Sequence, residues 1–130
     1  MARPQKEGLE YFPHDVHASN DEKLEPLIML YGAAGYAFYF MHLEYIYRNN
    51  ELSFDISDAE TIQVFCSKLQ ITQEQYQKIL NSAIKLKCFN KEVYESEKKL
   101  TSNGIKKRAS TITEKREKER LRYEEFKTKK

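Results

Sequence analysis

The sequence predicts a mostly α fold with a small β component: a winged helix-turn-helix with a long charged C-terminal helix. Three observations support this prediction. Two helix starts with capping residues, at 57–60 and 72–75, each open an amphipathic segment, and only a short turn separates those segments. Two runs that suit extended structure follow, at 88–96 and 98–102. Residues 109–130 are then dominated by Glu, Lys and Arg.

The totals indicate one domain with an uneven charge distribution. A chain of 130 residues, 40% of them apolar, can bury a sizeable core. We expect residues 1–108 to form this domain and residues 109–130 to form a charged helical tail or linker. The formal charge of +2 combines −7 over residues 1–65 with +9 over residues 66–130. A basic half most often meets nucleic acid or another anionic surface.

Targeting signals and redox chemistry have little support in the sequence. The N-terminus lacks the apolar segment of a signal peptide, and no apolar run reaches the ~18 residues of a membrane span. Cys66 and Cys88 lie in apolar contexts, which predicts two buried, reduced side chains. We therefore expect a cytoplasmic protein with no membrane partner.

The N-terminal segment is expected to be irregular. Leu9 and Tyr11 alternate with Glu10 and Phe12 before Pro13, which fits a short edge strand or an extended arm.

A first helix is expected after Asn20, a capping residue followed by acidic residues. Pro26 leaves two interpretations open: the helix begins at Pro26, or a short helical turn precedes it. Gly32 is expected to end this helix.

The segment 33–48 predicts a helix that is apolar nearly all round, so it must be buried on more than one side. It is either the central helix of the domain or part of a subunit interface, and both can hold. The candidate residues for an oligomer interface are Tyr11, Phe12, Phe38, Tyr39, Met41 and Tyr45.

The helix-turn-helix is predicted from two capping boxes. After a candidate strand at 51–56, Ser57 and Glu60 are expected to open a helix that runs to about Lys68. Thr72 and Gln75 are expected to open the second helix, which runs to about residue 86 and presents one polar face to a DNA major groove.

The wing is predicted to be a β-hairpin formed by the two extended runs. On its return, Leu100 is expected in the core and Ser102 or Asn103 at the cap of the next helix. Gly104 is expected to allow a close approach to the neighbouring strand.

The candidate DNA-binding residues combine polar side chains of the second helix with cations of the wing and the last helix. Gln and Asn can pair with adenine, and lysines contact phosphates. The set is Gln73, Gln75, Gln77, Lys78, Asn81, Lys85, Lys91, Lys98, Lys99, Lys106, Lys107 and Arg108.

No enzymatic site, metal site or cofactor is expected. His14 and His17 have the spacing of metal ligands, but they lie in a loop without a third ligand. His42 is expected to be a satisfied histidine of the core or an interface, and no nucleophile–base set has supporting context.

Several segments resemble, in order, the N-terminal domain of DnaD-like replisome organisers of phages and prophages. They are RPQKEGLEYFPHDV, GAAGYAFY, EYIYRN, KLQIT, CFNKEVY and LTSNGIKKR, within residues 3–108. The resemblance implies a winged helix that self-associates, binds duplex or single-stranded DNA and acts with a replicative helicase or its loader. Pro26 and Asn50 depart from the family pattern, and such organisers carry a further C-terminal region.

Two other functions are consistent with the sequence. One is a winged-helix adaptor that binds proteins, suggested by the aromatic segment 33–48. The other is a sequence-specific transcriptional regulator.

Overall fold

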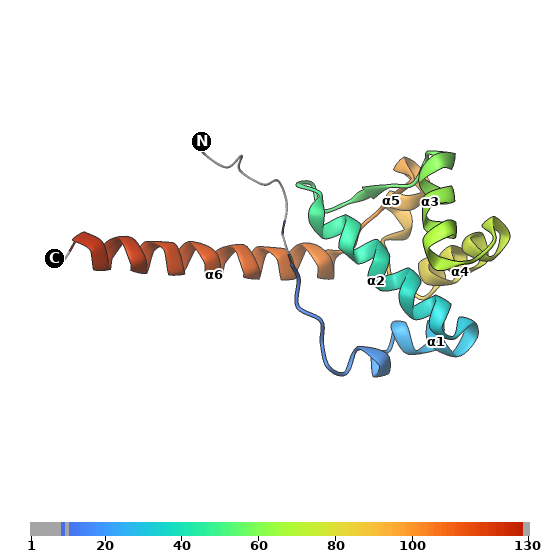
Figure 1. The fold of residues 1–130 in the computed structure, drawn as a ribbon, viewed down its shortest axis with the longest axis horizontal. Helices are drawn as coiled ribbons and strands as arrows, with labels where there is room; N and C mark the ends of the chain where they lie inside the picture. Colours follow the sequence, from blue (N-terminus) through green and yellow to red (C-terminus); the bar gives the residue numbers. More distant parts are fainter. Residues whose placement is uncertain (1–8, 10, 129–130) are drawn as a thin grey trace.

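The computed structural model describes residue 9 and residues 11–128, and this part of the chain is mostly helical with one small sheet (Figure 1). The predicted class, mostly α with a small β component, is confirmed. In chain order the elements are the 3-10 turn η1 (Ala18–Asn20), α1 (Leu24–Tyr31), α2 (Ala33–Arg48), β1 (Phe54–Asp55), α3 (Ala59–Leu69), α4 (Gln73–Lys85), α5 (Lys91–Glu97), β2 (Lys99–Leu100) and α6 (Asn103–Thr128).

Helices α1 and α2 form a tight pair. Helix α1 begins two residues before Pro26, so the second of the two interpretations of this proline is the correct one. Gly32 ends α1 with φ of 64°, as predicted. Gly35 is buried, and a Cβ there would lie 2.5 Å from the carbonyl oxygen of Leu27. The absence of a side chain at residue 35 therefore lets the two helices pack closely.

Helices α3 and α4 form the predicted helix-turn-helix arrangement, but the first cap differs from the prediction. Asp58 caps α3 by accepting the backbone N–H of Glu60 at 2.9 Å. The Ser57 hydroxyl instead donates to Asp55 at 2.6 Å, so Ser57 is not the cap. Gln70 ends α3 in the left-handed region, and the chain then enters α4 within three residues.

The predicted hairpin wing is wrong. Asn90 accepts the backbone N–H of Val93 at 3.0 Å and starts helix α5 where an extended run was expected. The returning segment forms β2, whose partner is β1, with Phe54 opposite Leu100 in an antiparallel pair. The candidate strand 51–56 is strand only over Phe54–Asp55. A helix and a two-residue ladder therefore replace the hairpin.

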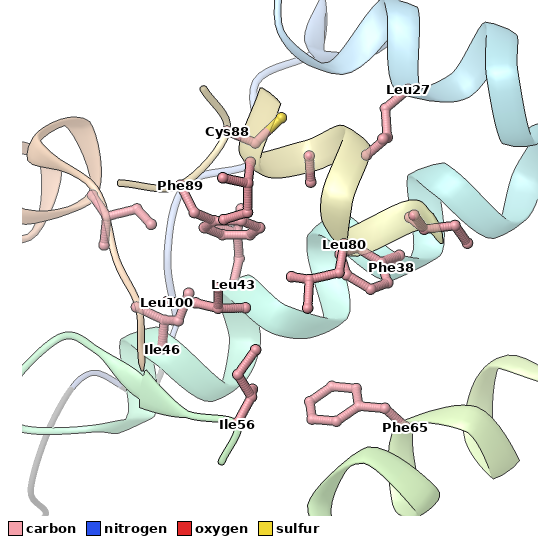
Figure 2. Close-up of a cluster of buried hydrophobic side chains, with 14 of the residues drawn as sticks. Leu27, Phe38, Leu43, Ile46, Ile56, Phe65, Leu80, Cys88, Phe89 and Leu100 are labelled. Atoms are coloured by element: carbon pink, nitrogen blue, oxygen red, sulfur yellow. The ribbon is translucent and has the colours of Figure 1, made fainter. Parts of the chain in front are cut away.

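Helix α2 is the central helix of the core. Figure 2 shows its apolar side chains meeting those of α1, α3, α4 and β2. Cys66 and Cys88 are buried free thiols, as predicted. The fully buried large side chains include Leu27, Phe38, Ile46, Phe65, Leu80, Phe89 and Leu100.

Helix α6 starts in the core and then projects from the body (Figure 1). Ser102 accepts the backbone N–H of Ile105 at 3.1 Å, which identifies it as the cap. Ile105 and Ala109 are buried. A Cβ on Gly104 would meet nothing closer than 3.7 Å, so the expected close approach to a strand is absent.

The described part of the N-terminal segment is an extended arm rather than a strand. The backbone N–H of Leu9 donates to the carbonyl of Tyr47 at 2.9 Å, and the Phe12 ring stacks on Tyr47 at 4.7 Å. Tyr11 lies 5.3 Å from the guanidinium carbon of Arg116, which links the arm to α6.

Candidate nucleic-acid interface

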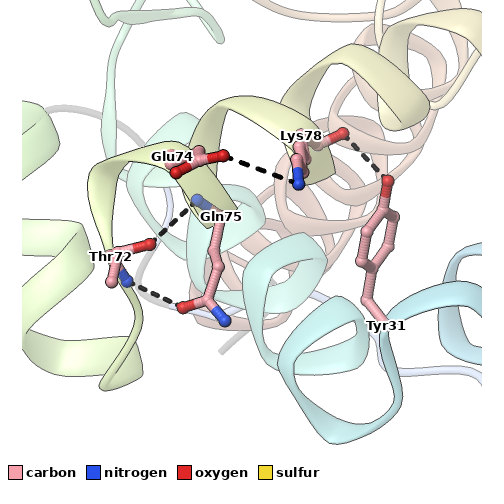
Figure 3. A network of polar contacts seen from close by, with 5 residues as sticks. All are labelled: Tyr31, Thr72, Glu74, Gln75 and Lys78. Atoms are coloured by element: carbon pink, nitrogen blue, oxygen red, sulfur yellow. Dashed lines mark hydrogen bonds and ion pairs between the residues drawn. The ribbon is translucent and has the colours of Figure 1, made fainter.

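Helix α4 presents a polar face because its sequence fixes both its start and its orientation. Thr72 and Gln75 form a reciprocal capping box, with N···O distances of 3.1 and 2.9 Å. Figure 3 shows these two contacts at the start of the helix. The opposite side of α4 is buried through Tyr76, Ile79, Leu80, Ala83 and Ile84.

The exposed residues of α4 differ in how far they are free to contact a ligand. The side chain of Gln75 is engaged in the cap, so it is a poor candidate for reading bases. Lys78 lies 3.7 Å from Glu74, and its carbonyl accepts the Tyr31 hydroxyl at 3.1 Å (Figure 3). Gln77 donates to Asn81 at 2.8 Å. These surface contacts are weak enough to exchange for contacts with DNA.

A groove of about 590 Å³ lies at the C-terminal end of α4. It is bounded by the end of α4, the start of α5 and the start of α6, with Ile84 and Phe89 among its lining residues. Four cations and one acid line it: Lys23, Lys85, Lys87, Lys91 and Glu92. We refer to these four lysines and the space between them as the lysine groove.

Tertiary contacts bring the four lysines together. The Cys88 thiol donates to the carbonyl of Lys23 at 3.5 Å, which links the start of α1 to the turn after α4. Lys87 has φ of 65°, so the chain reverses sharply at this residue. The backbone N–H of Asn90 donates to Thr101 at 2.7 Å and holds the start of α5 against the segment before α6.

The groove includes two predicted residues, Lys85 and Lys91, and two that the sequence did not reveal. Lys23 lies in the acidic half of the chain and Lys87 in a turn, so neither belongs to a basic run or a helix face. Lys91 also contacts Glu95 at 3.9 Å in an exposed pair.

Of the three cations expected on the wing, Lys91 lines this groove, and Lys98 and Lys99 do not. Lys98 ends α5 in the left-handed region, and its Nζ lies 4.6 Å from the ring centre of Tyr94. Lys99 lies in β2 and contacts Glu51 at 3.8 Å. Because the hairpin is absent, these two lysines belong to the sheet and the end of α5.

The three cations at the start of α6 are all exposed, but Arg108 also contacts the body. Lys106 and Lys107 follow the last lining residue of the lysine groove, Gly104. The Nε–H of Arg108 donates to the Tyr47 hydroxyl at 3.2 Å. Burial lowers the pKa of Arg108, but its contacts with Tyr47 and Tyr39 outweigh burial, and the pKa is raised overall. Arg108 is therefore engaged with the body rather than grouped with its neighbours.

The residues predicted for an oligomer interface differ in their exposure. Phe38 is completely buried against His42 and Tyr76, so it is unavailable to a second copy. Tyr11 is 68% exposed. The remaining predicted residues, Phe12, Tyr39, Met41 and Tyr45, are half-buried.

A hollow of about 660 Å³ lies between the N-terminal arm and α2. Phe12 and Tyr39 line it together with Arg108. Burial raises the pKa of the Tyr39 phenol.

The histidines show no catalytic arrangement. The His14 ring stacks on Phe40 at 4.0 Å, and its Nε2 lies 2.8 Å from the Tyr36 hydroxyl. His42 is a satisfied core histidine, as predicted, since both ring nitrogens have partners. Within residue 9 and residues 11–128, no group of three His, Cys, Asp or Glu residues could hold a metal ion. In the same residues, every helix is too short or too polar to cross a bilayer.

Comparison with known proteins identifies the family of the chain and one relative named as phage-related. Over 120 residues the chain is 33% identical to the uncharacterized phage-related protein Lin1244/Lin1753 of Listeria innocua. The match covers 92% of this chain and 38% of that relative, so the chain spans well under half of the relative's length. No solved structure matches the chain. The family model described as Lin1244/Lin1753-like, N-terminal, matches residues 11–105, and the chain belongs to this family.

Proposed function

We propose that this chain is a non-enzymatic, cytoplasmic DNA-binding module of a phage or prophage replication initiation protein. The observation that carries the proposal is the lysine groove, where four cations face a single carboxylate at the end of the polar face of α4. Cations gathered in a groove attract the phosphates of nucleic acid and release counterions when they bind them.

In the proposed complex, α4 enters the major groove and the lysine groove holds the adjacent backbone. Gln73, Gln77 and Asn81 are exposed and supply amide groups that can read base edges. Lys85 connects the two surfaces because it lies on α4 and also lines the groove. The fold then serves as a winged helix in which α5 and β2 stand where a hairpin wing was expected.

The replication role is inferred from the resemblance to DnaD-like replisome organisers and fits a relative named as phage-related. We propose that copies associate through Tyr11, Phe12 and Tyr39, which lie in or beside the contact between the arm and α2. The proposed protein partner is a replicative helicase or its loader.

The test is fluorescence anisotropy with a labelled DNA duplex over a salt series. The double variant K87Q/K91Q removes two groove cations, and K115Q/K118Q removes two exposed cations of α6 as a matched control. We expect the slope of log affinity against log salt to fall by about 1.8 for the groove variant, since each phosphate contact contributes about 0.9. The control should retain nearly the full slope. Absence of duplex binding by the wild type at low salt, or equal slopes for both variants, would refute the proposal.

A protein-binding adaptor is the second candidate, and exposed apolar side chains on α1 favour it. Met29 is 78% exposed and Leu30 is 65% exposed. Adjacent exposed apolar residues of this size are typical of a protein contact. If M29E/L30E disrupts assembly or partner binding while duplex binding is absent in the wild type, the adaptor is the better description. A footprint confined to one palindromic site would instead favour a transcriptional regulator.

A further inference from the structure

A second cationic site surrounds Tyr45 at the C-terminal end of α2. The Nζ of Lys68, in α3, donates to the Tyr45 hydroxyl at 2.5 Å. The guanidinium carbon of Arg48 lies 4.4 Å from the centre of the Tyr45 ring. Two cations from different helices are therefore held at one aromatic side chain.

A hollow of about 580 Å³ opens beside these groups. Its lining residues are Tyr45, Arg48, Asn49, Asn50, Glu51 and Phe54. Its volume is in the range of small-ligand pockets.

The lining of the hollow includes one cation, Arg48, and one acid, Glu51, and Lys68 adds a second cation beside it at the Tyr45 hydroxyl. The hydrogen bond from Lys68 lowers the pKa of the Tyr45 phenol, and the charges of Lys68 and Arg48 act in the same direction. The acidic neighbours are paired with cations: Glu44 lies 3.7 Å from Arg48, and Glu51 lies 3.8 Å from Lys99. Pairs as exposed as these contribute little free energy, so a phosphate can replace the carboxylate.

The chemistry of the hollow matches that of sites for unpaired strands. Such sites combine cations for the backbone with planar groups on which bases stack, and arginine guanidinium planes serve as well as aromatic rings. Arg48 is held against Tyr45 while its side chain remains 58% exposed, so its guanidinium is both oriented and accessible.

We infer that this hollow, the Tyr45 site, binds one nucleotide of a single-stranded nucleic acid. The phosphate contacts Lys68 and Arg48, and the base stacks on the Arg48 guanidinium. The side-chain amide of Asn50 and the NH2 group of Asn49 supply hydrogen bonds at the base edge, since the Oδ1 of Asn49 already accepts the backbone N–H of Glu51 at 2.8 Å. This inference rests on the proposed DNA-binding function, but no residue lines both this hollow and the lysine groove.

The experiment is anisotropy with a fluorescein-labelled oligothymidylate over a salt series. The variant R48Q/K68Q should bind roughly tenfold more weakly, since losing one stacked base and its backbone contacts has an effect of this order. Its salt slope should fall by about 1.4, because each single-strand phosphate contact contributes about 0.7. The matched control is again K115Q/K118Q. Circular dichroism and thermal unfolding of each variant verify that the fold is retained.

Glu51→Gln tests the same site through a change that should strengthen binding instead of weakening it. Removing this carboxylate should tighten binding of the oligothymidylate roughly two- to threefold, since repulsion of the phosphate is relieved at high effective dielectric. If Glu51 and its neighbours only stabilise the fold, E51Q should not tighten binding of the oligothymidylate.

The outcomes separate the two proposals. If wild type and K115Q/K118Q bind duplex DNA with the full salt slope, K87Q/K91Q loses slope, and R48Q/K68Q binds oligothymidylate as well as the control does, the Tyr45 site is refuted and the lysine groove is supported. If R48Q/K68Q loses single-strand binding while retaining duplex binding, and K87Q/K91Q shows the reverse, both sites are supported. If wild type binds neither nucleic acid, both proposals fail.

Discussion

The imidazole of His42 and the phenol of Tyr76 join α2 to α4 in the core, with 2.8 Å between Nε2 and the hydroxyl oxygen. The Nδ1–H of His42 donates to the carbonyl of Phe38 at 2.6 Å, so Nε2 of the neutral ring accepts from Tyr76. Both side chains are completely buried, and the Phe65 ring stacks on His42 at 4.1 Å. A neutral histidine therefore orients the helix that carries the candidate DNA-reading face.

Acid should destabilise the fold through His42. Burial lowers its pKa from 6.5 to about 4, with an opposing effect from the hydrogen bond to Phe38. Because the unfolded chain binds the proton more readily, stability is full above pH 6.5 and falls as the pH decreases toward 4. Between pH 7 and 5 the loss should be about 2 kcal/mol. Urea unfolding at the two pH values measures it.

The control for this prediction is the exposed His17. H17A should keep the full pH dependence between pH 7 and 5. H42F should remove most of the pH dependence of stability. It also leaves the Tyr76 hydroxyl without its hydrogen-bond partner. An unchanged pH dependence in H42F would assign the effect to other groups.

Substitution of Gly35 should separate α1 from α2. A Cβ there would lie 2.5 Å from the backbone oxygen of Leu27, which cannot move aside as a side chain can. We expect G35A to lower the free energy of unfolding by about 1–3 kcal/mol. G104A is the matched control, since its Cβ would meet nothing closer than 3.7 Å, and it should be neutral or stabilising by up to about 1 kcal/mol. Equal effects in thermal unfolding would contradict the packing argument.

Local signals in the sequence were sufficient for most helices. The capping box at Thr72 and the apolar pattern of 33–48 involve neighbouring residues only, and both were confirmed. Gly32 was assigned correctly for the same reason, and Ser102 is the correct one of the two residues expected at the cap of α6.

The wing and the lysine groove depend on contacts between distant residues. The backbone N–H of Ile56 donates to Lys98 at 2.9 Å, so β2 pairs with a strand far upstream instead of with a hairpin partner. Lys23 and Lys87 line the same groove because the Cys88 thiol contacts the Lys23 carbonyl, and no periodicity or charge run predicts this contact. The sequence could therefore predict the face of α4 but not the groove at its end.

Arg108 and Lys107 should behave differently although they are neighbours in a basic run. Arg108 donates to Tyr47, so R108Q should lower the melting temperature and leave the salt slope of duplex binding unchanged. The reason is that Arg108 donates to the buried Tyr47, although the exposure of the guanidinium limits the contribution of this hydrogen bond to about 1 kcal/mol. Lys107 is exposed, so K107Q should keep the melting temperature. If Lys107 contacts a phosphate, K107Q should lower the slope of log affinity against log salt by about 0.9. The reverse pattern in thermal unfolding and anisotropy would restore Arg108 as a DNA contact.

Removing the cap of α5 should couple stability to DNA binding. Asn90 accepts the backbone N–H of Val93 and lines the lysine groove between Phe89 and Lys91. N90A should cost about 1 kcal/mol in urea unfolding, the usual value for a lost cap. It should also weaken duplex binding, because Lys91 loses the helix start that positions it. D58A is the comparison, since it removes the cap of α3, which supplies no residue of the α4 face or of the lysine groove. If both variants lose similar stability and only N90A loses affinity at matched salt, the start of α5 positions the groove. Equal losses of affinity would show that general destabilisation is responsible.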